Sequence, residues 1–334
     1  MEEQRNEDRK YFSRIGLAYF TGGILSELLA NAVYRLLLMW RPEWSNNTNI
    51  GVIVSTVVIY FICLPIVILM VKRIPGNAPT QHSMKPHQWL GALVSCYAVG
   101  YTCNIIGLLL TAFIGALKGS AVENPALNTI SSLNVGISFV CTVLIAPTFE
   151  EFVFRKLLLD RTRKYGEGMA VLLSGLMFGL FHGNLNQFAY AFTLGLALAF
   201  VYLKTGKIQY TIGIHMCINL VGGVVAPFAM QMLDYEEYMR RYLIAIEFGD
   251  MAGLYQYMME HALGIILLMG VGLFAIGAIL AGLIVLIVNC KRIRFAKGEI
   301  TIPKGERFKT VILNVGMLLF SLFWIFMILL QIFS

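Results

Sequence analysis

Apolar residues occur along this chain in long runs, and short polar segments separate one run from the next. A helix needs roughly 20 apolar residues to cross the hydrocarbon core of a bilayer. Because every backbone amide inside hydrocarbon must be hydrogen-bonded within the protein, runs of this length can only be helices. The pattern predicts an all-α fold, a polytopic transmembrane bundle of about eight or nine spans that forms a single membrane domain over residues 1–334. The predicted spans lie at approximately 17–39, 51–71, 88–117, 133–158, 169–183, 187–203, 208–226, 262–289 and 311–333.

Two predicted segments differ from the rest. The span at 169–183 is short and is followed by an Asn-Leu-Asn segment, so it is also consistent with a half-buried helix that turns back within the protein. The segment 229–261 is amphipathic, acidic and rich in tyrosine and methionine. Such a segment is expected to lie along the extracytoplasmic membrane surface.

Composition and charge also indicate a membrane protein. Apolar residues make up 58% of the 334 residues and charged residues only 13%, whereas soluble domains carry about 25% charged residues. The net charge of +7 does not indicate nucleic-acid binding, because lysine and arginine concentrate in alternate short loops. By the positive-inside rule, this distribution places the N-terminus in the cytoplasm and the C-terminus outside. We therefore expect an integral membrane protein that contacts the lipid bilayer and no nucleic acid, and the short loops favour a bacterial cytoplasmic membrane.

Ionisable residues within the apolar sequence cluster mainly between residues 147 and 219. Insertion of one such side chain into a membrane span costs about 2.5–3.5 kcal/mol, so we expect each to have a structural or functional role. Glu151 and Arg155 are four residues apart and share a helical face, on which they can form an ion pair. Glu150 points about 100° away from that face and remains free to act as a base. Pro147 removes a backbone hydrogen bond just upstream and is expected to kink or open the helix.

Two further groups follow in the same region. Phe178 and His182 are four residues apart, and so are His215 and Asn219, which places each pair on one helical face. Taken alone, His182 fits a packing residue, and the second pair fits a polar clamp between helices. The paired glutamates alone fit a purely structural role in ion pairs. Together, however, the three groups predict a buried polar cavity and a catalytic core over about 133–226.

The sequence does not predict the same depth in the membrane for Glu150, His215 and His182. At 1.5 Å per residue, Glu150 lies roughly 9–16 Å from the basic residues that close its helix, and His215 lies roughly 12 Å from Lys207. His182 lies deeper, roughly 20 Å from Met169. The fifth predicted span should therefore be tilted or begin below the others.

The three groups resemble the motifs of the CAAX protease and bacteriocin-processing family of intramembrane proteases. These motifs are two glutamates with an arginine four positions after the second, then Phe-x-x-x-His, then His-x-x-x-Asn, and the resemblance covers about residues 140–225. It implies a membrane endopeptidase whose cavity opens toward the cytoplasm, with a peptide or protein substrate that arrives from the membrane or the cytoplasmic side. A prenylated C-terminal motif, a peptide pheromone, a leader peptide and a membrane receptor all fit that description.

The resemblance also implies four catalytic residues and three supporting ones. Glu150 as general base and His182 together activate a water, while His215 and Asn219 stabilise the oxyanion. This scheme needs no serine or cysteine nucleophile, and a donor to an oxyanion often contributes about 2.7–4 kcal/mol. The supporting residues are Glu151, Arg155 and Phe178.

A zinc site is the alternative mechanism, since two histidines, a glutamate and a water form a common catalytic set. Its ligands would be Glu150, His182 and His215. The sequence has no His-Glu-x-x-His motif, and we favour the mechanism without a cofactor. A different class of function also fits, a non-proteolytic membrane scaffold or bacteriocin-immunity protein that uses the fold to bind a partner. A proton-coupled or ion-coupled transporter would need inverted repeats, which the sequence does not show.

Overall fold

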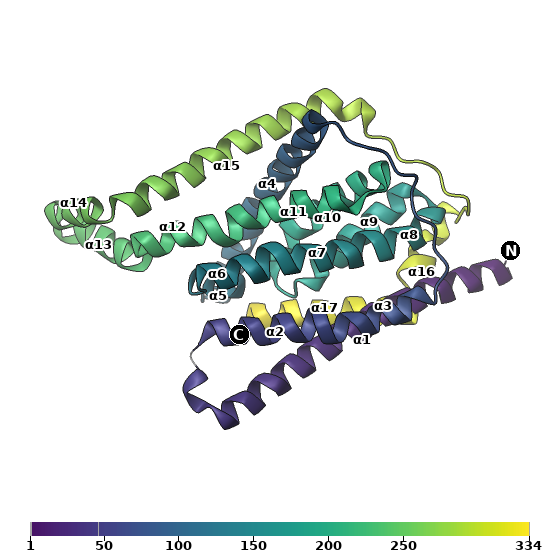
Figure 1. Cartoon of the computed structure of the whole chain (residues 1–334), viewed down its shortest axis with the longest axis horizontal. Helices are drawn as coiled ribbons and strands as arrows, with labels where there is room; N and C mark the ends of the chain where they lie inside the picture. The colour runs from purple at the N-terminus through teal and green to yellow at the C-terminus, as the bar shows by residue number, and fades with distance from the viewer. Residues whose placement is uncertain (1, 46, 334) are drawn as a thin grey trace.

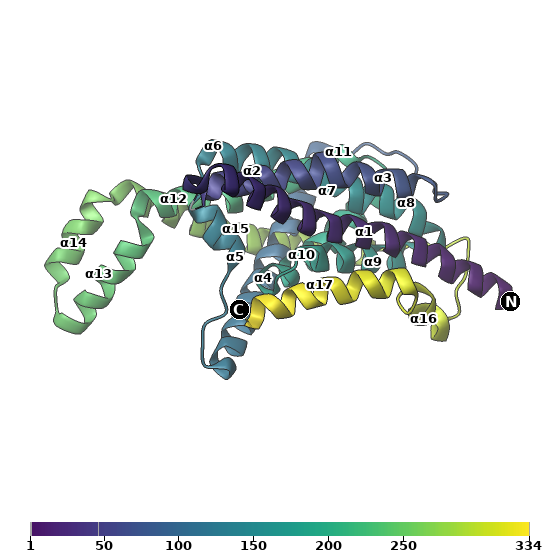
Figure 2. The same cartoon turned by 90° about the horizontal axis from the view of Figure 1, so that it is seen from below.

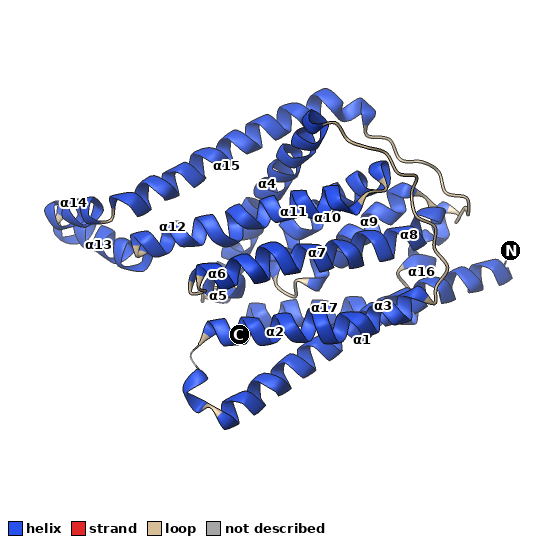
Figure 3. Cartoon of the chain, in the orientation of Figure 1, coloured by secondary structure: helices blue, strands red, loops and turns tan. Residues whose placement is uncertain are grey.

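The fold is an all-α bundle, as predicted. In the computed structural model, which describes residues 2–45 and 47–333, every regular element is helical. Within that part of the chain, eight helices are long and apolar enough to cross a membrane. Figure 3 shows these helices packed side by side, with loops confined to the connections between them. The protein is therefore a polytopic integral membrane protein.

The bundle is built from rods that consist of one helix or of several consecutive helical segments. The single helices are α1 (Glu2–Trp40), α4 (Pro86–Lys118), α9 (Glu167–Phe181), α10 (Leu185–Thr205), α15 (Ala262–Asn289) and α17 (Val315–Phe333). The composite rods are α2 (Thr48–Thr56) with η2 (Val57–Cys63) and α3 (Leu64–Lys72); α6 (Val135–Ser138) with η3 (Phe139–Ile145), α7 (Ala146–Glu151), η4 (Phe152–Leu157) and α8 (Leu158–Thr162); and α11 (Ile208–Leu220) with η6 (Val221–Val225) and α12 (Ala226–Leu233). The connecting helices are α5 (Pro125–Ser131), α13 (Tyr235–Phe248), α14 (Met251–Glu260) and α16 (Arg307–Val311), and the short 3-10 turns are η1 (Pro42–Trp44), η5 (Arg163–Tyr165), η7 (Cys290–Arg292) and η8 (Lys304–Glu306).

The first and last rods run side by side in the same direction. Figures 1 and 2 show α1 leaving the N-terminal end of the bundle and α17 running alongside it toward the opposite end. This arrangement requires an odd number of passes, so α9 must count as one of them. Yet α9 has 15 residues and is about 22 Å long, less than the roughly 30 Å of hydrocarbon. It therefore ends within the bundle, in agreement with the alternative of a helix that turns back inside the protein.

The turn between α9 and α10 is held by neighbouring elements. Gly183 has a φ of +65°, and a Cβ there would lie 3.1 Å from the ring of Trp324. Glycine meets both demands, because it adopts positive φ without strain and has no side chain. Asn184 caps the start of α10, and Gln331 Oε1 accepts a hydrogen bond from the amide of Leu185. The polar backbone of the turn is thus satisfied by protein groups, as a membrane interior demands.

The rod that carries the paired glutamates is longer than predicted. It continues past residue 158 to Thr162, and α9 begins only at Glu167. Measured along each helix, Glu150 lies about 18 Å from Thr162, and His182 lies about 22 Å from Glu167. The two side chains therefore lie at similar depth. The sequence predicted that the fifth span is tilted or begins below the others because the predicted fourth span ended too early, at residue 158.

Three of the four π-helical segments in the described part of the chain end two residues before a proline: η2 before Pro65, η3 before Pro147 and η6 before Pro227. A proline has no amide hydrogen, and its ring clashes with the carbonyl group four residues earlier. The helices respond by widening, so that the amide of Ala146, for example, donates to the carbonyl of Cys141 five residues back. Pro147 thus follows an opened turn, as predicted.

The predicted amphipathic segment 229–261 is largely a helical hairpin. Figures 1 and 2 show α13 and α14 projecting from one end of the bundle, away from the other rods. Several of its apolar side chains are exposed, among them Leu243, Ile246 and Phe248. Its location on the extracytoplasmic membrane surface stays a prediction.

The crossing of α1 and α17 allows a test of the packing. A Cβ at Gly316 would overlap backbone atoms of Ser13 and Leu17 in α1, and close helix approach through small residues is typical of membrane bundles. We expect Gly316→Ala to lower the free energy of unfolding by about 1–3 kcal/mol, because backbone atoms cannot move aside. Thermal unfolding in detergent measures the change. The control is Gly272→Ala, where nothing lies within 4 Å of the added Cβ, and an equal loss in both variants would contradict the expectation.

Candidate active site

A cavity of about 360 Å³ lies inside the bundle and is lined by α4, α5, η3, α7, α9, α10, α11 and η6. Glu150, His182, His215 and Asn219 all line it. The structure therefore brings the four residues predicted to be catalytic to one hollow, although they come from segments up to 69 positions apart (150 to 219). Phe178 also lines the cavity.

Glu151 and Arg155 form the predicted ion pair beneath the cavity. Both side chains are fully buried, and Arg155 Nε donates to Glu151 Oε2 over 3.1 Å. Arg155 Nη1 also donates to Ser174 Oγ on α9 at 2.9 Å. The guanidinium carbon lies 4.6 Å from the centre of the Phe178 ring, a distance at which a cation and an aromatic face attract each other. The arginine therefore links the rod of the glutamates to α9.

The second oxygen of Glu151 binds the second histidine. His215 Nδ1 lies 3.0 Å from Glu151 Oε1, so a protonated Nδ1 donates to this carboxylate. The other ring nitrogen, Nε2, lies 3.8 Å from Glu150 Oε2. Glu151 thus does more than pair with Arg155, because it also fixes the orientation of the His215 ring. No spacing along the sequence indicated this contact, which joins residues 64 positions apart.

His182 is oriented by its own helix. Its Nδ1 lies 2.8 Å from the carbonyl oxygen of Phe178, and a carbonyl only accepts, so the proton is on Nδ1. In the neutral ring, Nε2 then keeps its lone pair as an acceptor. The Phe178 ring meets both imidazoles edge to face, with centroids 4.9 Å from His182 and 5.8 Å from His215. Phe178 therefore acts as a spacer that holds the two histidines apart.

The amide of Asn219 is also held in place. Its Nδ2 donates to the carbonyl oxygen of Thr142 over 2.8 Å, and Thr142 belongs to the π-helical segment η3. An amide nitrogen carries two hydrogens, so one remains after this bond. Because Asn219 itself lines the cavity, the second hydrogen is a donor that a ligand there can use.

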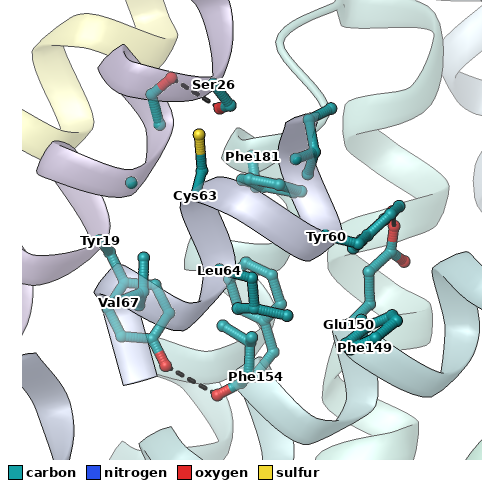
Figure 4. Close-up of a pocket in the computed structure, with 14 residues that line it drawn as sticks. Tyr19, Ser26, Tyr60, Cys63, Leu64, Val67, Phe149, Glu150, Phe154 and Phe181 are labelled. Carbon is teal, nitrogen blue, oxygen red and sulfur yellow. Dashed lines mark hydrogen bonds between the residues drawn. The ribbon is translucent and has the colours of Figure 1, made fainter. Parts of the chain in front are cut away.

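Glu150 has a partner that the sequence pattern did not reveal. The hydroxyl of Tyr60, in η2, donates to Glu150 Oε1 over 2.8 Å. Figure 4 shows this contact beside a small, mostly apolar pocket between α1, the η2–α3 rod and α7–η4. A tyrosine in an apolar run is unremarkable as a pattern, so nothing in the sequence singled out Tyr60. The same holds for the α4 residues Tyr97, Tyr101 and Asn104, which line the polar cavity.

The residues named for a zinc site do not form a metal-binding group. Within residues 2–45 and 47–333, no three or more His, Cys, Asp or Glu side chains are arranged to hold a metal ion. Glu150, His182 and His215 share the cavity, and Glu150 Oε2 lies 3.8 Å from His215 Nε2. A catalytic zinc needs three protein ligands and a water, and the mechanism without a cofactor stays a prediction.

Similarity to known proteins covers the same part of the chain. A family model described as Type II CAAX prenyl endopeptidase Rce1-like matches residues 132–221, a segment that contains all seven predicted site residues. The chain is 23% identical over 171 residues to the putative membrane peptidase YdiL of Bacillus subtilis, which covers 49% of this chain and 68% of that protein. It is 25% identical over 228 residues to the membrane-embedded CAAX protease MroQ of Staphylococcus aureus, which covers 64% and 87% respectively. No solved structure matches the chain.

The matched segment begins just before α6 and ends just after α11. It therefore includes the elements that carry the paired glutamates, both histidines and the asparagine. Motifs, fold and relatives agree on one class of membrane protein. Over this segment the chain is similar to the CAAX protease and bacteriocin-processing family, and the protein is a membrane-embedded peptidase.

Proposed function

We propose that this peptidase hydrolyses a peptide bond with a water activated by Glu150, and that His215 and Asn219 stabilise the oxyanion. The observation that carries the proposal is the shared cavity of Glu150, His182, His215 and Asn219. Each of the four side chains is already held by a hydrogen bond or close contact on its far side. Catalytic groups that are fixed before substrate binds need no reorganisation during the reaction.

The first step is proton transfer from water to Glu150. Its Oε1 accepts from Tyr60, so Oε2 is the oxygen available to the water. The lone pair on His182 Nε2 accepts the second hydrogen of the same water and orients it. As Glu150 takes the proton, the water oxygen attacks the carbonyl carbon of the scissile bond, a form of general base catalysis that typically contributes 10²–10⁴-fold in rate.

The second step is stabilisation and collapse of the tetrahedral intermediate. Asn219 donates its remaining N–H to the oxyanion. His215, protonated on both nitrogens, donates from Nε2 while Glu151 accepts from Nδ1. The carbon–nitrogen bond then breaks and Glu150 returns its proton to the leaving amine. The second hydrogen of the water passes from the new carboxyl group to that amine, so the products are a carboxylate and an ammonium group.

The substrate in this proposal is a peptide or protein segment that reaches the cavity from the membrane or the cytoplasmic side. On α4 the rings of Tyr97 and Tyr101 stack at 5.5 Å, and both line the cavity with Asn104. Stacked aromatic rings and an amide suit an extended peptide, which presents apolar side chains and backbone groups together. The description of MroQ as a CAAX protease supports a substrate cut near its C-terminus, with or without a prenyl group.

Substitution of the catalytic groups tests the mechanism. Incubation of the purified protein with a peptide library, with cut sites read by mass spectrometry, first supplies a cleaved peptide. On that peptide we expect Glu150→Gln and His182→Ala to lower kcat/KM at least about 100-fold and Asn219→Ala about 100-fold to 1,000-fold. Glu43→Gln is the control, because Glu43 is exposed and forms an ion pair with Arg41, outside the cavity lining. Near-normal cleavage by Glu150→Gln, in protein that folds as the wild type does, would refute the role of Glu150.

Removal of metal tests the absence of a metal from the mechanism. We expect cleavage of the same peptide to continue unchanged after dialysis against a strong chelator, because Glu150 takes the proton without a metal-bound water. Metal analysis of the dialysed, active protein completes the measurement. Loss of activity on chelation that added zinc restores would overturn the metal-free mechanism.

Cysteine labelling tests the proposed orientation, with the N-terminus in the cytoplasm. Cys290 is exposed at the end of α15, on the same side as the N-terminus. A membrane-impermeant maleimide should therefore label Cys290 only after the cells are permeabilised. In a Cys290→Ser background, Glu247→Cys in the α13–α14 hairpin should react in intact cells. The reverse pattern would show that the protein is inserted the other way round.

A further inference from the structure

We propose that Tyr60 is a positioning residue for the general base, one that fixes which oxygen of Glu150 faces the catalytic water. The inference rests on the proposed function of Glu150. Its basis is the 2.8 Å hydrogen bond between Tyr60 and Glu150 Oε1. An ionised carboxylate only accepts hydrogen bonds, so the tyrosine hydroxyl is the donor whenever Glu150 is charged and ready to act.

The location of Glu150 explains why it needs such a partner. Glu150 lines both the polar cavity and the small apolar pocket of Figure 4, and it is the one described residue that the two linings share. The other residues around the apolar pocket include Val67, Phe149 and Phe154. An ionised oxygen facing this pocket without a donor would be costly, and Tyr60 supplies that donor.

The remaining oxygen of Glu150 is thereby directed toward the reaction. Oε2 lies 3.8 Å from His215 Nε2, on the side of the polar cavity. The terminal torsion of a glutamate is broad and roughly two-fold, so a carboxylate without a fixed partner samples many orientations. One hydrogen bond on Oε1 restricts this rotation and holds Oε2 toward the water.

Tyr60 is itself held rigidly. Its ring stacks on Phe149, the neighbour of Glu150, with centroids 5.4 Å apart and planes 17° apart. The residue lies in the π-helical turn η2 that precedes Pro65. Tyr60 is not among the residues that line the polar cavity, so it acts through Glu150 and not on the substrate.

The test compares two tyrosines that line the same apolar pocket. Tyr60→Phe removes the hydroxyl bound to Glu150 and keeps the ring. Tyr19→Phe is the matched control, because the Tyr19 hydroxyl donates to the carbonyl oxygen of Val153 over 2.7 Å and does not touch Glu150. The kcat and KM of both variants are measured on one internally quenched peptide that the wild-type protein cleaves, with Glu150→Gln as the reference for loss of the base.

We expect Tyr60→Phe to lower kcat about 10-fold to 100-fold with KM unchanged, the range for loss of a hydrogen bond to a charged group. Tyr19→Phe should leave kcat unchanged, whatever its effect on the melting temperature. Wild-type kcat in Tyr60→Phe, or a rise in KM alone, would overturn the positioning role. An equal fall in kcat for both tyrosine variants would also overturn it, because it would mark a general effect of lost packing. If Glu150→Gln remains active, the proposed function fails instead, so the two failures can be told apart.

Discussion

The site depends on the contacts that the buried carboxylate of Glu151 makes with its neighbours. A carboxylate without a partner is strongly disfavoured inside a membrane, and this one has partners on two other side chains, Arg155 and His215. Arg155 in turn binds Ser174 on α9. A single buried anion therefore connects the three rods that carry the proposed catalytic groups. Removal of one partner from such a buried pair typically costs about 3–5 kcal/mol, so the site and the bundle share the same stabilising contact.

The sequence was sufficient to predict features that lie within a single helix. The spacing of Glu151 and Arg155 predicted their ion pair, and Pro147 predicted an opened turn, because both effects depend only on helical geometry. It was also sufficient to name the residues that meet in the cavity, through motifs characteristic of the family. It was not sufficient for contacts between helices, such as those from Glu151 to His215 and from Tyr60 to Glu150. These depend on the rotation of each helix about its axis, which apolar patterns determine poorly when nearly every face is apolar.

The positions at which the helices end were also predicted incorrectly from the sequence. The rod of the glutamates runs on to Thr162, so His182 and Glu150 reach similar depth although α9 has only 15 residues. Short spans of this kind are possible because the turn at Gly183 packs against the ring of Trp324 and is hydrogen-bonded to Gln331. Hydropathy alone cannot distinguish these surroundings, since Trp324 and Gln331, which cover the turn, lie about 140 positions away (183 to 324).

The π-helical turn η3 has a consequence for how such a protein can change over time. A π-helical turn amounts to an α-helix with one residue inserted. Loss of a single residue from Phe139–Ile145 would restore ordinary α-helical winding and close the widened turn, while the helix on either side kept nearly the same orientation. Thr142 lies inside that turn, so its carbonyl oxygen would move relative to Asn219 although none of the proposed catalytic residues had been replaced. Insertions and deletions in this stretch should therefore disturb the position of Asn219 even where every side chain that lines the cavity is kept.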